Sequence, residues 1–139
     1  MFDETYTSSA FEALLRDDYQ LVSFFRRGIS FQYFLAIVAE SPFSLNEWSQ
    51  LLHLNEKTMT HLREEKQNFN VSFSERILDI SRVLRQGESV FGNRDDFRAW
   101  LEVNVPALGN IQPKSLLDNT FGIGILRDEL TRIEHGVLA

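Results

Sequence analysis

The chain of 139 residues contains no cysteine, which excludes disulfides, thiolate-bound metals, iron–sulfur clusters and cysteine nucleophiles. It also lacks any apolar run near the roughly 20 residues that span a bilayer. Its first residues, Met1-Phe2-Asp3-Glu4, do not show the basic and then apolar order of a signal peptide. We therefore expect a soluble, cytoplasmic protein without membrane contacts.

Positive charge is scarce as well. Lys and Arg number 14 against 20 Asp and Glu, so the net charge is −6. This balance argues against broad, sequence-independent binding to nucleic acid, but it leaves room for one small DNA-reading helix. Phenylalanine is abundant, with 12 residues, whereas proline and glycine number only 3 and 7. Such a composition favours helices that pack on bulky side chains.

Catalytic motifs are absent from the sequence. The three histidines, His53, His61 and His135, are not spaced four residues apart and form no H-E-x-x-H frame, so no metal site is predicted. Gly122-Ile123-Gly124 follows no predicted strand and lacks the third glycine of a dinucleotide-binding loop. No G-x-S-x-G elbow occurs either. We expect no catalytic residue, metal or cofactor, and thus no enzyme.

Apolar residues recur at helical spacing through most of the chain, and no segment alternates with the period of two that marks a strand. These patterns predict an all-α fold of seven to nine helices in two lobes. In the first half, one helix is expected over residues 9–27, capped by Ser8 or Ser9 and stopped by Gly28. A second helix is expected over residues 30–40.

Two helices stand out in the second half. One is expected to begin at Ser74 and Glu75 and to run toward Phe91. The other closes the chain, with Glu129 expected outside its apolar stripe and Gly136 as its C′ residue. The stripe consists of Ile123, Leu126, Leu130 and Ile133.

Residues 44–63 have the outline of a helix-turn-helix. Ser44 followed by Glu47 forms a capping box that opens a short helix, and Asn55 caps a second helix after a brief interruption. Met59 and Leu62 would face inward from this second helix. The same pattern also fits an ordinary helical hairpin in a bundle.

The second half carries an ordered series of short motifs, namely V-F-G at 90–92, A-W-L at 99–101, N-x-P-A-L-G at 104–109, P-x-x-L-L-D-x-x-x-G at 113–122 and L-x-R-I-E-H-G-V at 130–137. This series resembles the toxin-binding domain of the Xre/MbcA/ParS antitoxin family. Upstream, the helix-turn-helix falls where that family has its Xre-like domain.

The resemblance implies three parts: an N-terminal helical extension (1–27), an Xre-like helix-turn-helix domain (28–86) and a toxin-binding domain (87–139). It further implies an antitoxin that inhibits a RES-domain toxin, an enzyme that consumes NAD⁺. Such an antitoxin would form a homodimer and repress its own operon by binding operator DNA. A stand-alone helix-turn-helix regulator remains an alternative, as does an enzyme or ligand sensor.

Two departures from the family pattern affect the predicted sites. In the second helix of the helix-turn-helix, lysine replaces the first arginine of the family's basic run, and acidic residues flank it. The chain also extends two residues beyond the Gly136-Val137 end of the pattern. The residues expected to contact DNA are Lys57, Thr58, Thr60, His61 and Arg63.

We expect the polar face of the last helix and the apolar tail to bind the toxin. That face is too charged to be core, and a small apolar tail ending in a carboxylate suits a cleft that holds a nucleotide. The expected toxin-binding residues are Arg127, Thr131, Arg132, Glu134, His135, Gly136, Val137, Leu138 and Ala139.

Homodimerisation is expected through the helix-turn-helix lobe. The lobe and the segment before it hold more aromatic side chains than so small a unit would be expected to hide, and an exposed apolar patch commonly marks a contact surface. The aromatics in question are Phe24, Phe25, Phe31, Phe34 and Phe43.

Overall fold

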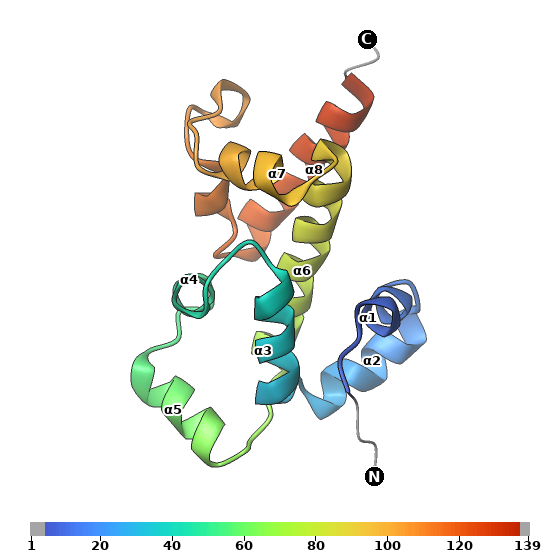
Figure 1. Cartoon of the computed structure of the whole chain (residues 1–139), viewed down its shortest axis with the longest axis vertical. Helices are drawn as coiled ribbons and strands as arrows, with labels where there is room; N and C mark the ends of the chain where they lie inside the picture. The colour runs from blue at the N-terminus through green and yellow to red at the C-terminus, as the bar shows by residue number, and fades with distance from the viewer. Residues whose placement is uncertain (1–4, 137–139) are drawn as a thin grey trace. The chain divides into compact units, whose positions relative to one another are not determined.

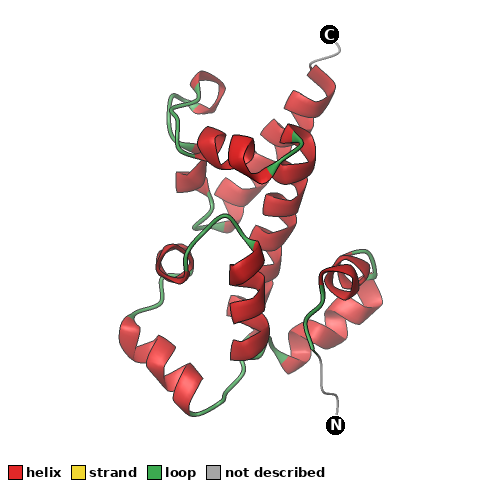
Figure 2. Cartoon of the chain, in the orientation of Figure 1, coloured by secondary structure: helices red, strands yellow, loops and turns green. Residues whose placement is uncertain are grey.

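The computed structural model describes residues 5–136, which form eight α-helices and two short 3-10 helices (Figures 1 and 2). Within this range no strand occurs, and one isolated β-bridge joins Val105 to Ile111. The predicted all-α fold is thus confirmed. The helices are α1 (Ser8–Leu15), α2 (Asp18–Arg27), α3 (Phe31–Glu40), α4 (Leu45–Leu51), α5 (Glu56–Glu64), α6 (Val71–Phe91), α7 (Arg94–Leu101), η1 (Pro106–Leu108), η2 (Pro113–Leu116) and α8 (Thr120–Gly136).

The chain divides into two compact units, Met1–Leu78 and Asp79–Ala139, with the division falling inside α6. The domain boundaries predicted after residues 27 and 86 remain predictions. None of the helices in the described part of the chain is long and apolar enough to cross a membrane.

The segment predicted as one helix over residues 9–27 is two helices, α1 and α2, which pack against each other. The break has a local cause. Asp17 takes an extended conformation, and its carboxylate accepts the backbone N–H groups of Tyr19 and Gln20, both at 3.1 Å. The cap at the start of α1 is Thr7 rather than Ser8 or Ser9. The cap at Asp17 therefore starts a new helix, although the apolar spacing continues across the break.

Helices α4 and α5 begin at the positions predicted from their capping residues, Ser44 and Asn55. Ser44 and Glu47 form the capping box of α4, each side chain accepting the other's backbone N–H at 3.1 and 3.0 Å. The Asn55 side chain accepts the N–H of Thr58 at 2.8 Å at the start of α5. Between the two helices, His53 adopts a left-handed conformation (φ 57°). The predicted helix-turn-helix is therefore present in the first unit.

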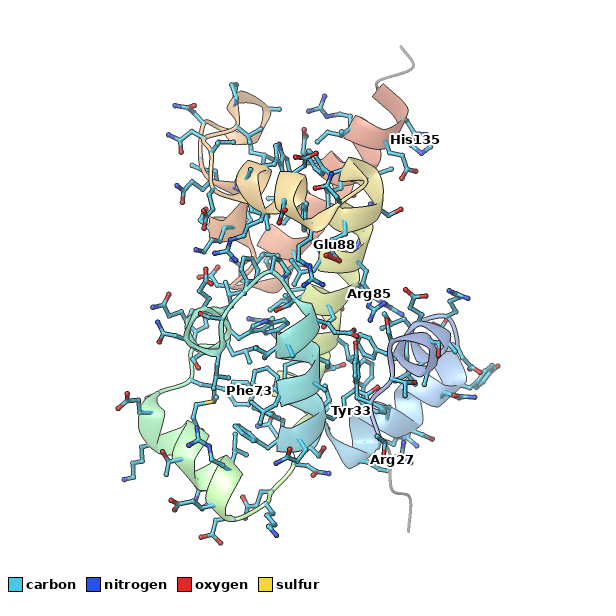
Figure 3. All side chains as sticks on the ribbon, in the orientation of Figure 1. Arg27, Tyr33, Phe73, Arg85, Glu88 and His135 are labelled. Carbon is cyan, nitrogen blue, oxygen red and sulfur yellow. The ribbon has the colours of Figure 1, made fainter. Side chains whose placement is uncertain are left out.

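Aromatic side chains fill the core of the first unit. Phe34 lies edge-on to Trp48 and to Phe69, with ring centroids 5.7 and 5.0 Å apart. Tyr33 projects from α3 toward α2 (Figure 3). Its ring centroid lies 5.1 Å from that of Phe24 on α2. The aromatic excess proposed as a dimer surface is thus internal packing, and that reason for a homodimer is wrong. Of the five aromatics, Phe24, Phe31, Phe34 and Phe43 are buried and Phe25 is half-buried.

The turn before α3 lies against the turn before α6, close enough for their backbones to form a hydrogen bond. The N–H of Phe69 donates to the carbonyl of Ile29 at 2.8 Å, and the N–H of Ile29 donates to the Ser74 hydroxyl at 2.9 Å. Ser74 is fully buried and lies within α6. The helix predicted to begin at Ser74 begins at Val71 instead, because the Asn70 side chain accepts the N–H of Phe73 at 2.8 Å.

In the second unit, η2 packs on α7 and α8. The core residues of these elements are buried, namely Phe97, Leu101, Leu117, Ile123, Leu126 and Leu130. Helix α8 starts where the Asn119 side chain accepts the N–H of Gly122 at 2.7 Å. At Gly122 a Cβ atom would lie 2.1 Å from the carbonyl oxygen of Leu116. Only glycine lets η2 approach α8 so closely.

We predict that Ser74→Ala destabilises the first unit by about 1–3 kcal/mol, because it leaves the buried N–H of Ile29 without an acceptor. Urea unfolding followed by tryptophan fluorescence measures the change. Ser72→Ala is the matched control, since Ser72 is exposed on the same helix. Equal stability of the two variants would contradict the role given to the Ser74 hydroxyl.

Two glycines of α8 offer a second, internally controlled comparison. Gly122→Ala is expected to destabilise the second unit by about 1–3 kcal/mol, because the new methyl group meets backbone that cannot move aside easily. At Gly124 a Cβ atom would lie more than 4 Å from every atom of the described residues outside the adjoining backbone of α8 and the two neighbouring residues, so Gly124→Ala is expected to stabilise by about 0.5–1 kcal/mol. Thermal unfolding by circular dichroism would show the opposite signs, and a loss of stability in both variants would refute this interpretation.

Candidate functional site

The outward face of α5 presents four side chains at helical spacing. Lys57, Thr60, His61 and Glu64 are all exposed, and the intervals of three, four and seven residues place them on one face of the helix. Met59 and Leu62 point the other way and are buried. Three of the five residues predicted to contact DNA therefore share a surface, and a carboxylate shares it with them.

The other two predicted DNA contacts lie differently. Thr58 is half-buried in the first turn of α5, where its N–H is held by the Asn55 side chain. Arg63 is exposed, but its guanidinium carbon lies 5.7 Å from the centre of the Phe31 ring, within the range of a cation–π contact. Arg63 is therefore engaged with α3 as well as open to solvent.

Charge on and around α5 is balanced. From residue 56 to residue 66, three lysines or arginines stand against three glutamates. Phosphate binding draws its energy from cations that displace counterions, and each nearby carboxylate opposes it. The outward face of α5 thus has the exposed polar residues expected of a recognition helix, but no surplus of positive charge.

The second candidate surface is the outward face of α8. The polar residues predicted from the sequence are exposed there, and Figure 3 shows His135 pointing away from the helix. Gly136 is exposed and is the last residue of α8. The predicted contacts Val137, Leu138 and Ala139 lie outside the described residues. The exposed polar residues are Arg127, Asp128, Thr131, Arg132, Glu134 and His135.

One acidic residue of α8 departs from the prediction. Glu129 was expected outside the apolar stripe, but its side chain is only 8% exposed. Arg132 forms a bidentate ion pair with it, with both oxygens 2.6 Å from one guanidinium nitrogen. The long arginine stem allows its head group to cover a carboxylate at the edge of the core. Arg132 is therefore paired within α8, although its side chain remains 62% exposed.

The outward face of α8 also contains apolar residues that sequence reasoning missed. Phe121 is 87% exposed and Ile125 is 50% exposed, one turn apart in the first half of the helix. Gly124 lies between them in the sequence. Periodicity could have found the pair, since neither residue falls on the buried stripe that includes Ile123, Leu126 and Leu130.

Within the described part of the chain, no three metal-ligating side chains come together. The candidate sites are thus the two helical faces described above. One lies on the helix-turn-helix unit and the other on the last helix of the second unit.

Comparison with known proteins assigns a class to each part. Residues 20–82 match the antitoxin Xre-like helix-turn-helix domain, and residues 86–136 match the antitoxin Xre/MbcA/ParS C-terminal toxin-binding domain. The fold and these matches define a helical protein that combines the two domains in this order. The chain belongs to the Xre/MbcA/ParS antitoxin family.

Curated relatives agree with this assignment. The chain is 30% identical over 97 residues to the Prs ADP-ribosylating antitoxin of Sphingobium sp. strain YBL2. These residues make up 63% of this chain and 61% of the relative. It is 31% identical over 75 residues to antitoxin Xre of Photorhabdus laumondii, covering 53% and 51% of the two chains. For antitoxin Xre of Yersinia enterocolitica the identity is 30% over 84 residues, covering 60% and 57%. The chain thus spans between half and about three fifths of these relatives.

Proposed function

We propose that this protein is the antitoxin of a toxin–antitoxin pair, and that it acts by binding rather than by catalysis. The match of residues 86–136 to a toxin-binding domain carries the proposal. The outward face of α8 supports it, because the apolar residues Phe121 and Ile125 are exposed there beside charged residues.

The proposed partner is a RES-domain toxin that degrades NAD⁺. This follows from the family resemblance. The name of the Sphingobium relative also refers to ADP-ribosylation, a reaction that draws ADP-ribose from NAD⁺. A net charge of −6 would favour the approach of this chain to a pocket lined with cations for a pyrophosphate. The reading frame next to this gene is the first place to look for such a toxin, and an unrelated neighbour would favour a stand-alone regulator.

We place inhibition at the end of α8 and the residues that follow. A chain stopped after Ile133 keeps the buried residues of α8 but loses Glu134, His135 and everything beyond. In an NAD⁺-consumption assay with the purified toxin, we expect this truncation to inhibit at least about tenfold less well than the full chain, a loss of about 1.4 kcal/mol.

Circular dichroism and a binding measurement serve as controls for the truncation. An unchanged spectrum with retained binding and lost inhibition identifies the end of the chain as the part that blocks the active site. Unchanged inhibition would move the blocking surface elsewhere, for example to the region of Glu102 and Asn104, both of which are exposed.

We further propose that the antitoxin binds operator DNA through the outward face of α5, with a homodimer as the binding species. The match of residues 20–82 to a helix-turn-helix domain supports this, as does the shared face of Lys57, Thr60 and His61. The balanced charge of the helix predicts weak binding, because few phosphates are neutralised.

Charge substitutions on that face test the DNA proposal. Lys57→Glu is expected to weaken operator binding about tenfold and to lower the slope of log K against log salt by about 1. Glu64→Gln is expected to strengthen binding, because it removes a negative charge from the same face. Lys57 is a cleaner choice than Arg63, whose replacement would also disturb the contact with Phe31.

Glu75→Gln, at an exposed position of α6 in the same unit, removes the same charge as Glu64→Gln and is its control in fluorescence anisotropy on the protein's own promoter. If both α5 variants bind like the wild type, this helix is not at the DNA. Light scattering on the same samples reports whether the chain is a dimer at micromolar concentration.

A further inference from the structure

The first half of α8 carries an apolar surface that the fold does not use. We define the α8 anchor as Phe121, Gly124 and Ile125. On a helix of 3.6 residues per turn, Gly124 and Ile125 lie three and four residues after Phe121 and share its side of the helix. The aromatic ring is 87% exposed, against 0–2% for the buried residues Ile123 and Leu126 that lie near it in the sequence.

Gly124 gives a second and independent observation. Glycine inside a helix is less favourable than alanine, because it loses more backbone freedom on folding. At Gly122 the fold explains the glycine, because η2 would collide with a Cβ atom there. At Gly124 a Cβ atom would have nothing within 4 Å, so no atom of the described residues excludes a larger side chain. Because Gly124 has no side chain, a partner can approach the backbone of α8 closely between Phe121 and Ile125, and we call this position the notch.

A second copy of this chain is a poor occupant of the anchor. If α8 pairs with its copy around a two-fold axis at Gly124, a residue a given number of positions before Gly124 faces the residue the same number of positions after Gly124 in the other copy. Because α8 begins at Thr120, only four residues before Gly124, the paired region would end at Asp128. The nine residues of α8 that each copy would contribute are well below the roughly 20–30 residues a side of a stable interface.

A different chain meets no such limit. It can cover the anchor and continue along the same side of α8 over Asp128, Arg132 and His135, which are exposed. Interfaces of this kind combine a central aromatic anchor with a polar and charged rim. We infer that the α8 anchor is the main apolar contact for the toxin, and that the charged second half of α8 forms the rim. This inference rests on the proposed antitoxin function.

The test measures the affinity of the full-length chain for the purified RES-domain protein encoded next to it, by calorimetry. Phe121→Ser is expected to weaken binding about 30-fold or more, as truncation of an aromatic hot spot does. Phe121→Leu, which keeps an apolar side chain, is expected to weaken binding less than Phe121→Ser. Tyr19→Ser is the matched control, because Tyr19 is an aromatic residue that is 91% exposed on α2 of the other unit, and it should change affinity less than about twofold.

Gly124→Ala separates a binding role from a structural one. We expect it to leave the fold as stable as the wild type or more so, and yet to weaken toxin binding, because the methyl group fills the notch. A structural role would move stability and affinity in the same direction. Circular dichroism on each variant confirms the fold.

Three outcomes would overturn the inference, and they differ from one another. If the wild type binds the toxin and Phe121→Ser binds equally well, the toxin does not use the anchor. If Phe121→Ser splits a dimer in sedimentation while toxin affinity is unchanged, the anchor belongs to a second copy. If the wild type binds no such toxin, the proposed function fails, and the assignment of the anchor fails with it.

Discussion

The first unit depends on one place where two stretches of backbone cross. Gly28 has a φ of 81°, and a Cβ atom there would lie 2.2 Å from the carbonyl oxygen of Phe69. This close approach lets Ile29 form hydrogen bonds with Phe69 and Ser74, so that the turn entering α3 is fixed to the turn entering α6. Helices α4 and α5 lie in the chain between those turns. The segment that contains α5 therefore has its two ends joined by hydrogen bonds. A recognition helix would need such support to keep its outward side chains in fixed positions.

Local signals in the sequence were enough to predict the helix-turn-helix. The capping box at Ser44 and the cap at Asn55 act within three residues of their partners, so no knowledge of the fold is needed to find them. The same kind of signal was overlooked at Asp17, because apolar periodicity runs through the break between α1 and α2 and makes one helix look continuous. At Asn70 the cap was missed, and the predicted start of α6 fell at Ser74 instead.

Burial at the candidate site could not be predicted in the same way, because it depends on what the fold brings alongside. Glu129 looks like a surface residue in the sequence, yet Arg132 covers it at the edge of the core. Phe121 is aromatic and yet almost fully exposed, and the one signal of this in the sequence is its position outside the apolar stripe of α8. The aromatic residues counted toward a dimer surface are likewise mostly inside, since Trp48 and Phe69 provide neighbours for them from distant parts of the chain. A residue type therefore indicates what a side chain can do, while only the fold decides whether a partner can reach it.

The two outward faces differ in the kind of energy they offer. On α5 the three cations between residues 56 and 66 are matched by three glutamates, so electrostatic attraction to phosphate is small and most of any affinity must come from contacts with bases. On α8 an aromatic ring and an open glycine precede a charged stretch, which combines desolvation of an apolar centre with polar contacts around it. An interface of the second kind gains most from burying its anchor and depends little on long-range charge. This contrast favours α8 as the face for a protein partner, whereas the DNA contacts proposed for α5 would gain affinity from the second recognition helix of the proposed homodimer.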